Sequence, residues 1–137
     1  MPAKDKIHNT VKNALIKDGW TIIADPYKIQ YEELILFADL GAERPITASS
    51  NGQMIVVEAK SFLGPSFADF EKALGQYLVY LALLELTAPE RKLYLGISNS
   101  AYHKFFKQKA VEAIIKRYKI ALPIVDVKTE EILKWQT

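Results

Sequence analysis

The N-terminal part of the chain shows two different hydrophobic spacings. Residues 5–17 carry apolar side chains every three or four positions, which is the spacing of an amphipathic helix. Residues 20–24 and 28–37 are rich in β-branched and aromatic side chains, which favour strands. Glu32-Glu33 interrupts the second of these runs. The pattern therefore predicts one helix followed by strands.

The stretch QMIVVEAKSF, from Gln53 to Phe62, predicts a strand that is covered on both faces. Its first apolar residues, Met54 to Val57, do not alternate with polar ones, as expected of a strand packed on each side. Asn51-Gly52 precedes it, and Asn-Gly between two β-prone runs is the strongest short hairpin signal because both residues tolerate positive φ. We therefore expect residues 40–48 to pair antiparallel with residues 54–60.

A long helix is expected next. Ser66 and Asp69 have the spacing of a capping pair, and Pro89 marks the end of the helix. From Tyr77 onward the segment is apolar nearly all round, so we expect the helix to be buried. Its apolar side chains are Phe67, Phe70, Leu74, Leu78, Leu81 and Leu84 or Leu86. The segments that follow are expected as a strand at 91–98, a basic amphipathic helix at 102–118, a strand at 120–127 and one or two helical turns at 129–135.

The order of these elements indicates the fold class. Helices that alternate with strands after an antiparallel hairpin are typical of a mixed sheet with helices on both faces. The predicted order is α-β-β-β-α-β-α-β, which makes the chain an α/β protein. It has 137 residues, half of them hydrophobic, which suits one ordinary domain with a real core. We expect a single domain over residues 1–137.

Composition excludes several classes of protein. The absence of cysteine excludes disulfides and thiolate metal sites. The N-terminus lacks the apolar core of a signal peptide. The longest apolar run, residues 77–84, has eight residues, whereas a span of the bilayer takes about 20. These features predict a soluble cytoplasmic protein with no membrane segment.

Charge is unevenly distributed along the chain. Residues 91–119 carry eight Lys or Arg against the single acid Glu112, although the net charge of the whole chain is only +2. Such asymmetry predicts a side that faces a polyanion such as DNA, or else only a solvated basic helix face. The candidate nucleic-acid-binding residues are Lys104, Lys107, Lys109, Lys116, Arg117 and Lys119. Because a net charge near zero is low for a DNA enzyme that acts alone, we also expect a homodimer or a partner complex.

An acid and a base occur together in the predicted covered strand. Side chains alternate along a strand, so Glu58 and Lys60 share one face and Ala59 points to the other. Charge in a covered sheet is costly unless it is paired or binds a metal, which makes this pair a candidate site. A solvated E-x-K at the end of an edge strand is the alternative.

The expected partner strand supplies further acids. Asp39 and Glu43 are four residues apart and share a face, and an ideal two-residue hairpin would place Glu43 opposite Lys60. Carboxylates that converge on one point suit Mg²⁺ or Mn²⁺, and a nearby ammonium can orient water or stabilise charge on a phosphate. The pattern therefore predicts a metal-dependent phosphodiester hydrolase.

These residues resemble the signature of the PD-(D/E)xK nuclease superfamily. Asp39 is followed after 18 residues by Glu58-Ala59-Lys60, although Ala38 stands where the superfamily usually has proline. The resemblance implies Asp39 and Glu58 as metal ligands and Lys60 as catalytic base or charge stabiliser. It favours Asp39 over Glu43, which we keep as the second candidate.

Residues of the long helix extend the resemblance. Gln76 and Tyr80 have the spacing seen in the branch of the superfamily similar to RecB-type nucleases, which implies that they support the site. They could equally form a polar seam in helix packing. Asp5 and His8 are weaker candidate ligands from the first helix, with a helix cap and an exposed histidine as the alternatives.

A more specific resemblance covers nearly the whole chain. The segments DKIHNTVKNALIKDGW, ADLGAER, VEAKSFLGPSF and ALGQY are similar to the XisH family of cyanobacterial factors that control excision of the fdxN DNA element. This implies a restriction-endonuclease-like fold and a role in DNA recombination beside a recombinase and a companion protein, XisI. Cleavage does not follow from it. Two functions stay open: a metal-dependent DNA endonuclease, and a non-catalytic DNA-binding or protein-assembly factor that acts with XisI.

Overall fold

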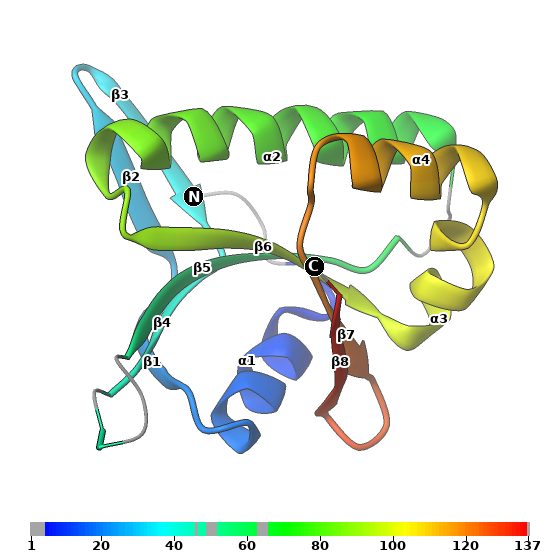
Figure 1. The fold of residues 1–137 in the computed structure, drawn as a ribbon, viewed down its shortest axis with the longest axis horizontal. Helices are drawn as coiled ribbons and strands as arrows, with labels where there is room; N and C mark the ends of the chain where they lie inside the picture. The colour runs from blue at the N-terminus through cyan, green and yellow to red at the C-terminus, as the bar shows by residue number, and fades with distance from the viewer. Residues whose placement is uncertain (1–4, 46, 49–51, 63–65, 137) are drawn as a thin grey trace.

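A six-stranded mixed sheet forms the centre of the protein (Figure 1). The computed structural model describes residues 5–45, 47–48, 52–62 and 66–136. The sheet order is β1-β4-β5-β6-β7-β8, with β5–β6 and β6–β7 parallel and the other pairs antiparallel. These strands are β1 (Thr21–Ala24), β4 (Leu40–Arg44), β5 (Gln53–Lys60), β6 (Arg91–Ser98), β7 (Leu122–Asp126) and β8 (Glu131–Gln136).

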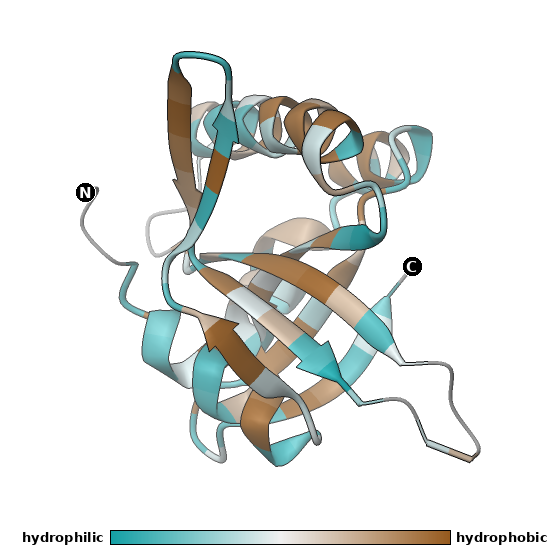
Figure 2. Cartoon of the chain, turned by 90° about the vertical axis from the view of Figure 1, so that its left-hand side faces the viewer, coloured by the Kyte–Doolittle hydropathy of each residue, from teal (hydrophilic) through white to brown (hydrophobic). Residues whose placement is uncertain are grey.

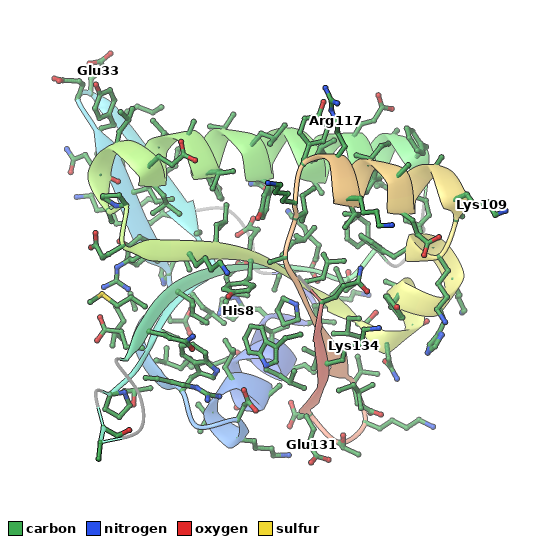
Figure 3. All side chains as sticks on the ribbon, in the orientation of Figure 1. His8, Glu33, Lys109, Arg117, Glu131 and Lys134 are labelled. Atoms are coloured by element: carbon green, nitrogen blue, oxygen red, sulfur yellow. The ribbon has the colours of Figure 1, made fainter. Side chains whose placement is uncertain are left out.

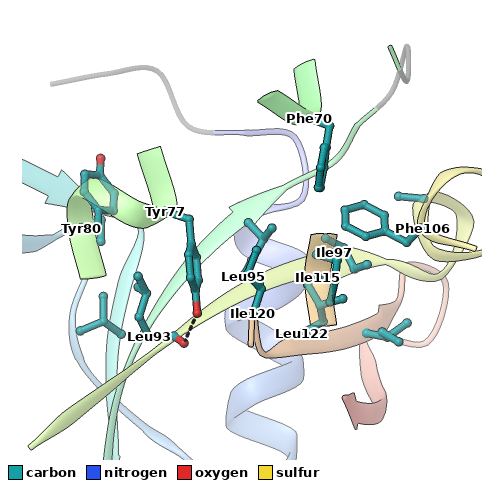
Figure 4. Close-up of a cluster of buried hydrophobic side chains, with 14 of the residues drawn as sticks. Phe70, Tyr77, Tyr80, Leu93, Leu95, Ile97, Phe106, Ile115, Ile120 and Leu122 are labelled. Atoms are coloured by element: carbon teal, nitrogen blue, oxygen red, sulfur yellow. Dashed lines mark hydrogen bonds between the residues drawn. The ribbon is translucent and has the colours of Figure 1, made fainter. Parts of the chain in front are cut away.

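Helices cover both faces of the sheet, which confirms the predicted α/β class (Figure 1). On one face, α1 (His8–Lys17) buries Val11 and Leu15 against β4 and β5. On the other face lie α2 (Phe67–Thr87) and α4 (Lys109–Arg117). Figure 4 shows this second core, which contains Phe70, Tyr77, Leu95, Ile97, Phe106, Ile115 and Leu122. In the part of the chain that the structure describes, no helix combines the length and apolarity that a membrane span requires.

A separate hairpin stands beside α2 and extends past it (Figure 2). It consists of β2 (Tyr27–Tyr31) and β3 (Leu34–Ala38), joined by a turn at Glu32-Glu33. Glu32 has φ +53°, which explains why the β-prone run breaks there. Because β1 and β4 belong to the main sheet, the chain crosses between the sheets twice, at Asp25-Pro26 and at Asp39. Five strands therefore precede the long helix, whereas the predicted order has three there.

The register of β4 against β5 differs from the ideal hairpin. Glu43 lies opposite Met54, not Lys60, and Leu40 lies opposite Val57. The connection between the strands spans residues 45–52, much longer than a two-residue turn. Gly52 has φ +81°, as the hairpin signal requires, whereas Asn51 lies outside the described residues. Because the loop is longer, each residue of β4 lies opposite a residue nearer the start of β5 than a two-residue turn would place it.

The long helix α2 is buried on one side only. Ser66 caps it as predicted, accepting a hydrogen bond from the Asp69 N–H at 3.2 Å, while Gly64-Pro65 lies outside the described residues. Its buried side chains are Phe70, Ala73, Tyr77, Tyr80 and Leu84. Val79 and Leu86 are 49% and 62% exposed. The expectation of a helix buried all round was wrong, because the sheet and the hairpin contact only one side of it.

The basic segment at 102–118, which was expected as one helix, is divided into a π-helical turn η1 (Tyr102–Phe106) and α4. A short helix α3 (Asn99–Ala101) precedes them. Phe105 and Phe106 are both buried, and their rings lie against Phe62 and Phe70. The wider π turn suits the burial of these two neighbours together, and α4 then begins in a new direction.

The last segment is a strand rather than the helical turns that we expected. Asp126 accepts hydrogen bonds from the N–H groups of Lys128 and Thr129, which turns the chain back, and β8 then pairs with β7. Trp135 packs its ring against Trp20 at 5.9 Å and Tyr94 at 5.1 Å between centroids. Side-chain packing of this kind outweighs the weak local helix preference.

This packing predicts the effect of truncating β8. Trp135→Ala is expected to lower the free energy of unfolding by about 2 kcal/mol, below the 3 to 5 kcal/mol of a fully buried aromatic residue. Leu133→Ala in the same strand, where the side chain is 56% exposed, should change it by less than about 0.5 kcal/mol. Urea unfolding followed by circular dichroism measures both, and equal effects would contradict the assigned packing.

Candidate functional site

Asp39 and Glu58 meet where the chain returns from the hairpin to the main sheet. The Asp39 N–H donates to Glu58 Oε1 at 3.1 Å, and the Ala59 N–H donates to Asp39 Oδ2 at 2.7 Å. Glu58 is buried because β5 is a central strand, with β4 and β6 on either side. The two carboxyl groups are thus held together by the backbone of two adjoining segments.

Lys60 lies on the same side of β5 as Glu58, as strand alternation requires. Its Nζ is 3.7 Å from Glu58 Oε2. Glu43 is elsewhere: it pairs with Arg91 at 2.9 Å, near the start of β5. Of the two candidates for the second acid, the structure brings Asp39 to Glu58 and leaves Glu43 apart, because the long loop 45–52 shifts the register.

Burial changes the acidity of this pair. Burial, together with the Asp39 charge and a hydrogen bond between the two carboxyl groups, raises the pKa of Glu58 to about 8, although the Lys60 ammonium acts in the opposite direction. Burial also raises the pKa of Tyr80, with the Glu58 charge adding to the effect. Near neutral pH, the Glu58 carboxyl group therefore retains its proton, and a bound cation would relieve the repulsion between the two carboxylates.

His8 is buried, which corrects the expectation of an exposed histidine. Its ring is 2% exposed and bridges two aspartates, with Nε2 2.7 Å from Asp25 Oδ1 and Nδ1 3.2 Å from Asp39 Oδ1. Lys12 Nζ lies 2.7 Å from Asp25 Oδ2. Burial alone would raise the pKa of Asp25, but the hydrogen bonds from Lys12 and His8 outweigh it and lower that pKa.

Asp25 and Lys12 were not identified from the sequence. Lys12 stands four residues after His8 and so lies on the same side of α1, which is a signal that could have linked the two. Asp25 stands before Pro26, between the β-prone runs 20–24 and 28–37, where Asp-Pro indicates a turn rather than a site. Its contact with His8 depends on the path of the chain between the two sheets, which no local pattern indicates.

Gln76 and Tyr80 face the same region from α2. The Gln76 amide donates to Tyr80 Oη at 3.0 Å, and the Tyr80 hydroxyl donates to the Phe37 carbonyl at 2.9 Å. These bonds connect α2 to Phe37 near the end of β3, two residues before Asp39. Both the supporting role and the polar-seam interpretation fit this contact.

Two adjoining hollows open beside the carboxyl pair. The smaller, of about 120 Å³, is lined by Asp5, Phe37, Asp39, Glu58, Ala59, Lys60 and Gln76. The second, of about 270 Å³, shares Asp5 and Lys60 and is lined also by Ser61, Phe62, Asp69, Lys72 and Ala73. Asp5 accepts a hydrogen bond from the Ile7 N–H and lies just before α1, which begins at His8. It therefore faces the site besides ordering the start of the helix.

The donor set suits a hard divalent cation. Among the described residues, no three or more His, Asp or Glu side chains are grouped so that they could hold a metal ion. Two carboxylates, however, are what Mg²⁺ commonly takes from a protein, with water and substrate phosphate completing the shell. Burial and the neighbouring Asp39 charge raise the pKa of Glu58, and a bound cation would offset the repulsion between the two carboxylates. Asp39 and Glu58 thus fit Mg²⁺ or Mn²⁺.

The basic candidates lie apart from the carboxyl pair. All six side chains are exposed, and Figure 3 shows Lys109 and Arg117 on α4 pointing away from the molecule. Lys104 and Lys107 flank Phe105-Phe106, whose rings pack on Phe62, two residues after Lys60. The basic segment therefore adjoins the end of β5 through this aromatic contact.

Comparison with known proteins identifies the family. Residues 1–133 match the sequence description of the XisH protein family. The chain belongs to the XisH family. The resemblance to the XisH family is thereby confirmed, and the match covers all of the candidate site and the basic segment.

Two solved structures are similar to this XisH-family chain over almost its full length. One is an XisH family protein from Nostoc punctiforme PCC 73102, with 37% identity and a TM-score of 0.87, covering 97% of this chain and 100% of that one. The other is a fdxN element excision controlling factor protein from Anabaena variabilis, with 35% identity and a TM-score of 0.85, covering 96% and 98%. No curated protein matches the chain.

Proposed function

We propose that this XisH-family protein is a DNA-element excision controlling factor whose carboxyl pair binds Mg²⁺ or Mn²⁺ and hydrolyses phosphodiester bonds in DNA. The observation that carries the proposal is the convergence of Asp39, Glu58 and Lys60 on one small hollow. Membership of the family, and the name of the similar Anabaena variabilis protein, support the role in excision.

Each residue has a defined task in this proposal. Asp39 and Glu58 would hold the cation, and the His8 ring contacts Asp39 through Nδ1. The cation would supply Lewis-acid charge to the phosphate. Lys60, 3.7 Å from Glu58, is placed to orient the attacking water or to stabilise charge that develops on the phosphate oxygens. Gln76 and Tyr80 hold the end of β3, and hence Asp39, against α2.

Cleavage is tested directly with supercoiled and linear DNA. The purified protein with Mg²⁺ or Mn²⁺ is expected to convert supercoiled plasmid to nicked or linear forms, and EDTA is expected to stop the reaction. Saturable Mn²⁺ binding, measured by electron paramagnetic resonance, checks the metal site without depending on turnover. A protein that neither binds Mn²⁺ nor cuts DNA would contradict the catalytic proposal.

DNA binding through the basic segment has its own signature. Phosphate contacts release counterions, so the logarithm of affinity falls with the logarithm of salt concentration by about 0.9 per phosphate neutralised. The double substitution Lys109→Gln with Arg117→Gln is expected to reduce that slope by about 2 and to weaken binding equally for all sequences. Fluorescence anisotropy at several salt concentrations measures it.

A control variant tests whether the smaller salt dependence comes from these two positions or only from the lower net charge of the protein. Lys128→Gln removes one exposed charge from the turn before β8, outside residues 91–119. It should leave the slope within about 0.3 of the wild-type value. If the control and the double variant reduce the slope alike, the basic segment is not the DNA-binding surface.

A non-catalytic assembly factor is the second candidate. The observation that favours it is exposed apolar surface on α2 and the hairpin, where Val79, Leu86, Leu34 and Ile35 are 44% to 62% exposed. Such a surface suits contact with an XisI-like companion, a recombinase or a second copy. Light scattering and pulldown with XisI test it: stable assembly without metal-dependent cleavage would favour this function over the first.

A further inference from the structure

The network around His8 lies at both points where the chain crosses between the two sheets. Asp25 follows β1, at the exit from the main sheet, and Asp39 precedes β4, at the return. The His8 ring bridges them, at 2.7 Å from Asp25 and 3.2 Å from Asp39. One buried side chain of α1 thus contacts both crossings.

The two contact distances indicate which aspartate binds the His8 ring more strongly. The shorter contact, from Nε2 to Asp25 Oδ1, is that of a charge-assisted hydrogen bond. The other Asp25 oxygen is bound by Lys12 Nζ at 2.7 Å, so the carboxylate is fixed at both ends by α1. Because Nε2 is held in this way, the ring presents Nδ1 to Asp39 Oδ1, while Asp39 Oδ2 is bound by the Ala59 N–H.

We propose that Asp25 is a positioning residue of the metal site: it orients His8, which in turn fixes Asp39 beside Glu58. This inference rests on the proposed function, because it concerns the same cation. Removal of an outer-shell group that helps to orient a metal ligand, here the Asp39 carboxylate, typically lowers metal affinity by 10- to 100-fold. Asp25 touches neither the cation nor the substrate; it acts only through the imidazole ring.

The experiment is Mn²⁺ titration of the full chain, with free Mn²⁺ measured by electron paramagnetic resonance. Asp25→Ala is expected to weaken Mn²⁺ binding about 10-fold. The matched control is Asp18→Ala, which also removes an ion-paired carboxylate next to α1, here the partner of Arg44 at 2.6 Å, but which does not contact His8. It should keep Mn²⁺ affinity within about twofold of wild type.

A double substitution shows whether Asp25 acts through His8. In a His8→Ala protein, adding Asp25→Ala should cause no further loss of affinity, because the ring that transmits the effect is gone. A general charge effect, or mere structural damage, would persist in that background and would overturn the proposal. His8→Asn serves the same purpose if His8→Ala does not fold, which circular dichroism in EDTA establishes.

The outcomes also separate this inference from the proposed function. If Asp25→Ala binds Mn²⁺ with wild-type affinity, the positioning role is overturned. If Glu58→Gln abolishes Mn²⁺ binding in the same experiment, the metal site itself is upheld. A wild-type protein without saturable Mn²⁺ binding would overturn both. A 10-fold loss in Asp25→Ala that vanishes without His8 is the result that we expect.

Discussion

Glu58→Gln is expected to lower metal-dependent DNA cleavage by about 1,000-fold. The substitution keeps the shape of the side chain but removes one of the two carboxylates proposed to hold the cation, and loss of a single charge-stabilising group in such sites typically costs 100- to 1,000-fold in rate. Lys60→Met should cost at least about 100-fold, since Lys60 is the ammonium nearest to Glu58. Single-turnover nicking of supercoiled plasmid, quantified on gels, measures the rates.

Glu43→Gln is the matched control for this prediction. Glu43 belongs to β4, one of the strands paired with β5, but it lies opposite Met54 and binds Arg91. Its loss should leave the cleavage rate within about twofold of wild type. If Glu43→Gln and Glu58→Gln lose activity equally, or if nicking persists in the Glu58 variant, the assignment of the site is wrong.

The metal-free protein is expected to lose stability as pH rises from about 4.5 to 8. The pKa of Glu58 is raised from 4.5 to about 8 in the folded chain, so the folded state binds its proton more tightly than the unfolded state does. This contribution is fully present below about pH 4.5 and is lost as pH rises through the folded pKa. Each pKa unit corresponds to about 1.4 kcal/mol, so the decline is on the order of 5 kcal/mol.

Urea unfolding in EDTA at a series of pH values measures this decline. Glu58→Gln should remove most of it, and Glu112→Gln, which changes an exposed carboxyl group of α4, should leave it unchanged. The lowered pKa of Asp25 and of Asp126 affects stability near and below pH 4, outside this window. Parallel curves for wild type and Glu58→Gln would contradict the assigned environment of Glu58.

The sequence predicted the fold class well because its signals were local and strong. The apolar run of β5, the capping pair Ser66 and Asp69, and the strand at 91–98 each depend on neighbouring residues alone, and each is present. The predictions were wrong where contacts between residues far apart in the sequence determine the local structure. Trp135 belongs to a strand because it packs on Trp20 and Tyr94, and Phe105-Phe106 breaks the predicted helix because both rings enter the core.

The candidate site was predicted in part for the same reason. Glu58 and Lys60 share a strand, so their proximity follows from alternation, and the motif resemblance supplied Asp39. The register argument for Glu43 failed because it assumed a two-residue turn. His8 and Asp25 meet through the crossings between two sheets, and the spacing of charged residues along α1 could have indicated only Lys12 as a neighbour of His8.

The position of β6 has a consequence for how the site comes into being during synthesis. Every residue placed in or beside the proposed metal site, from Asp5 to Tyr80, precedes β6, yet β6 is the parallel neighbour that covers one edge of β5. A nascent chain that has left the ribosome only as far as Thr87 therefore contains all the acids of the site before the sheet around β5 is complete. The burial that raises the pKa of Glu58 is thus complete only after residues 91–98 have joined the sheet.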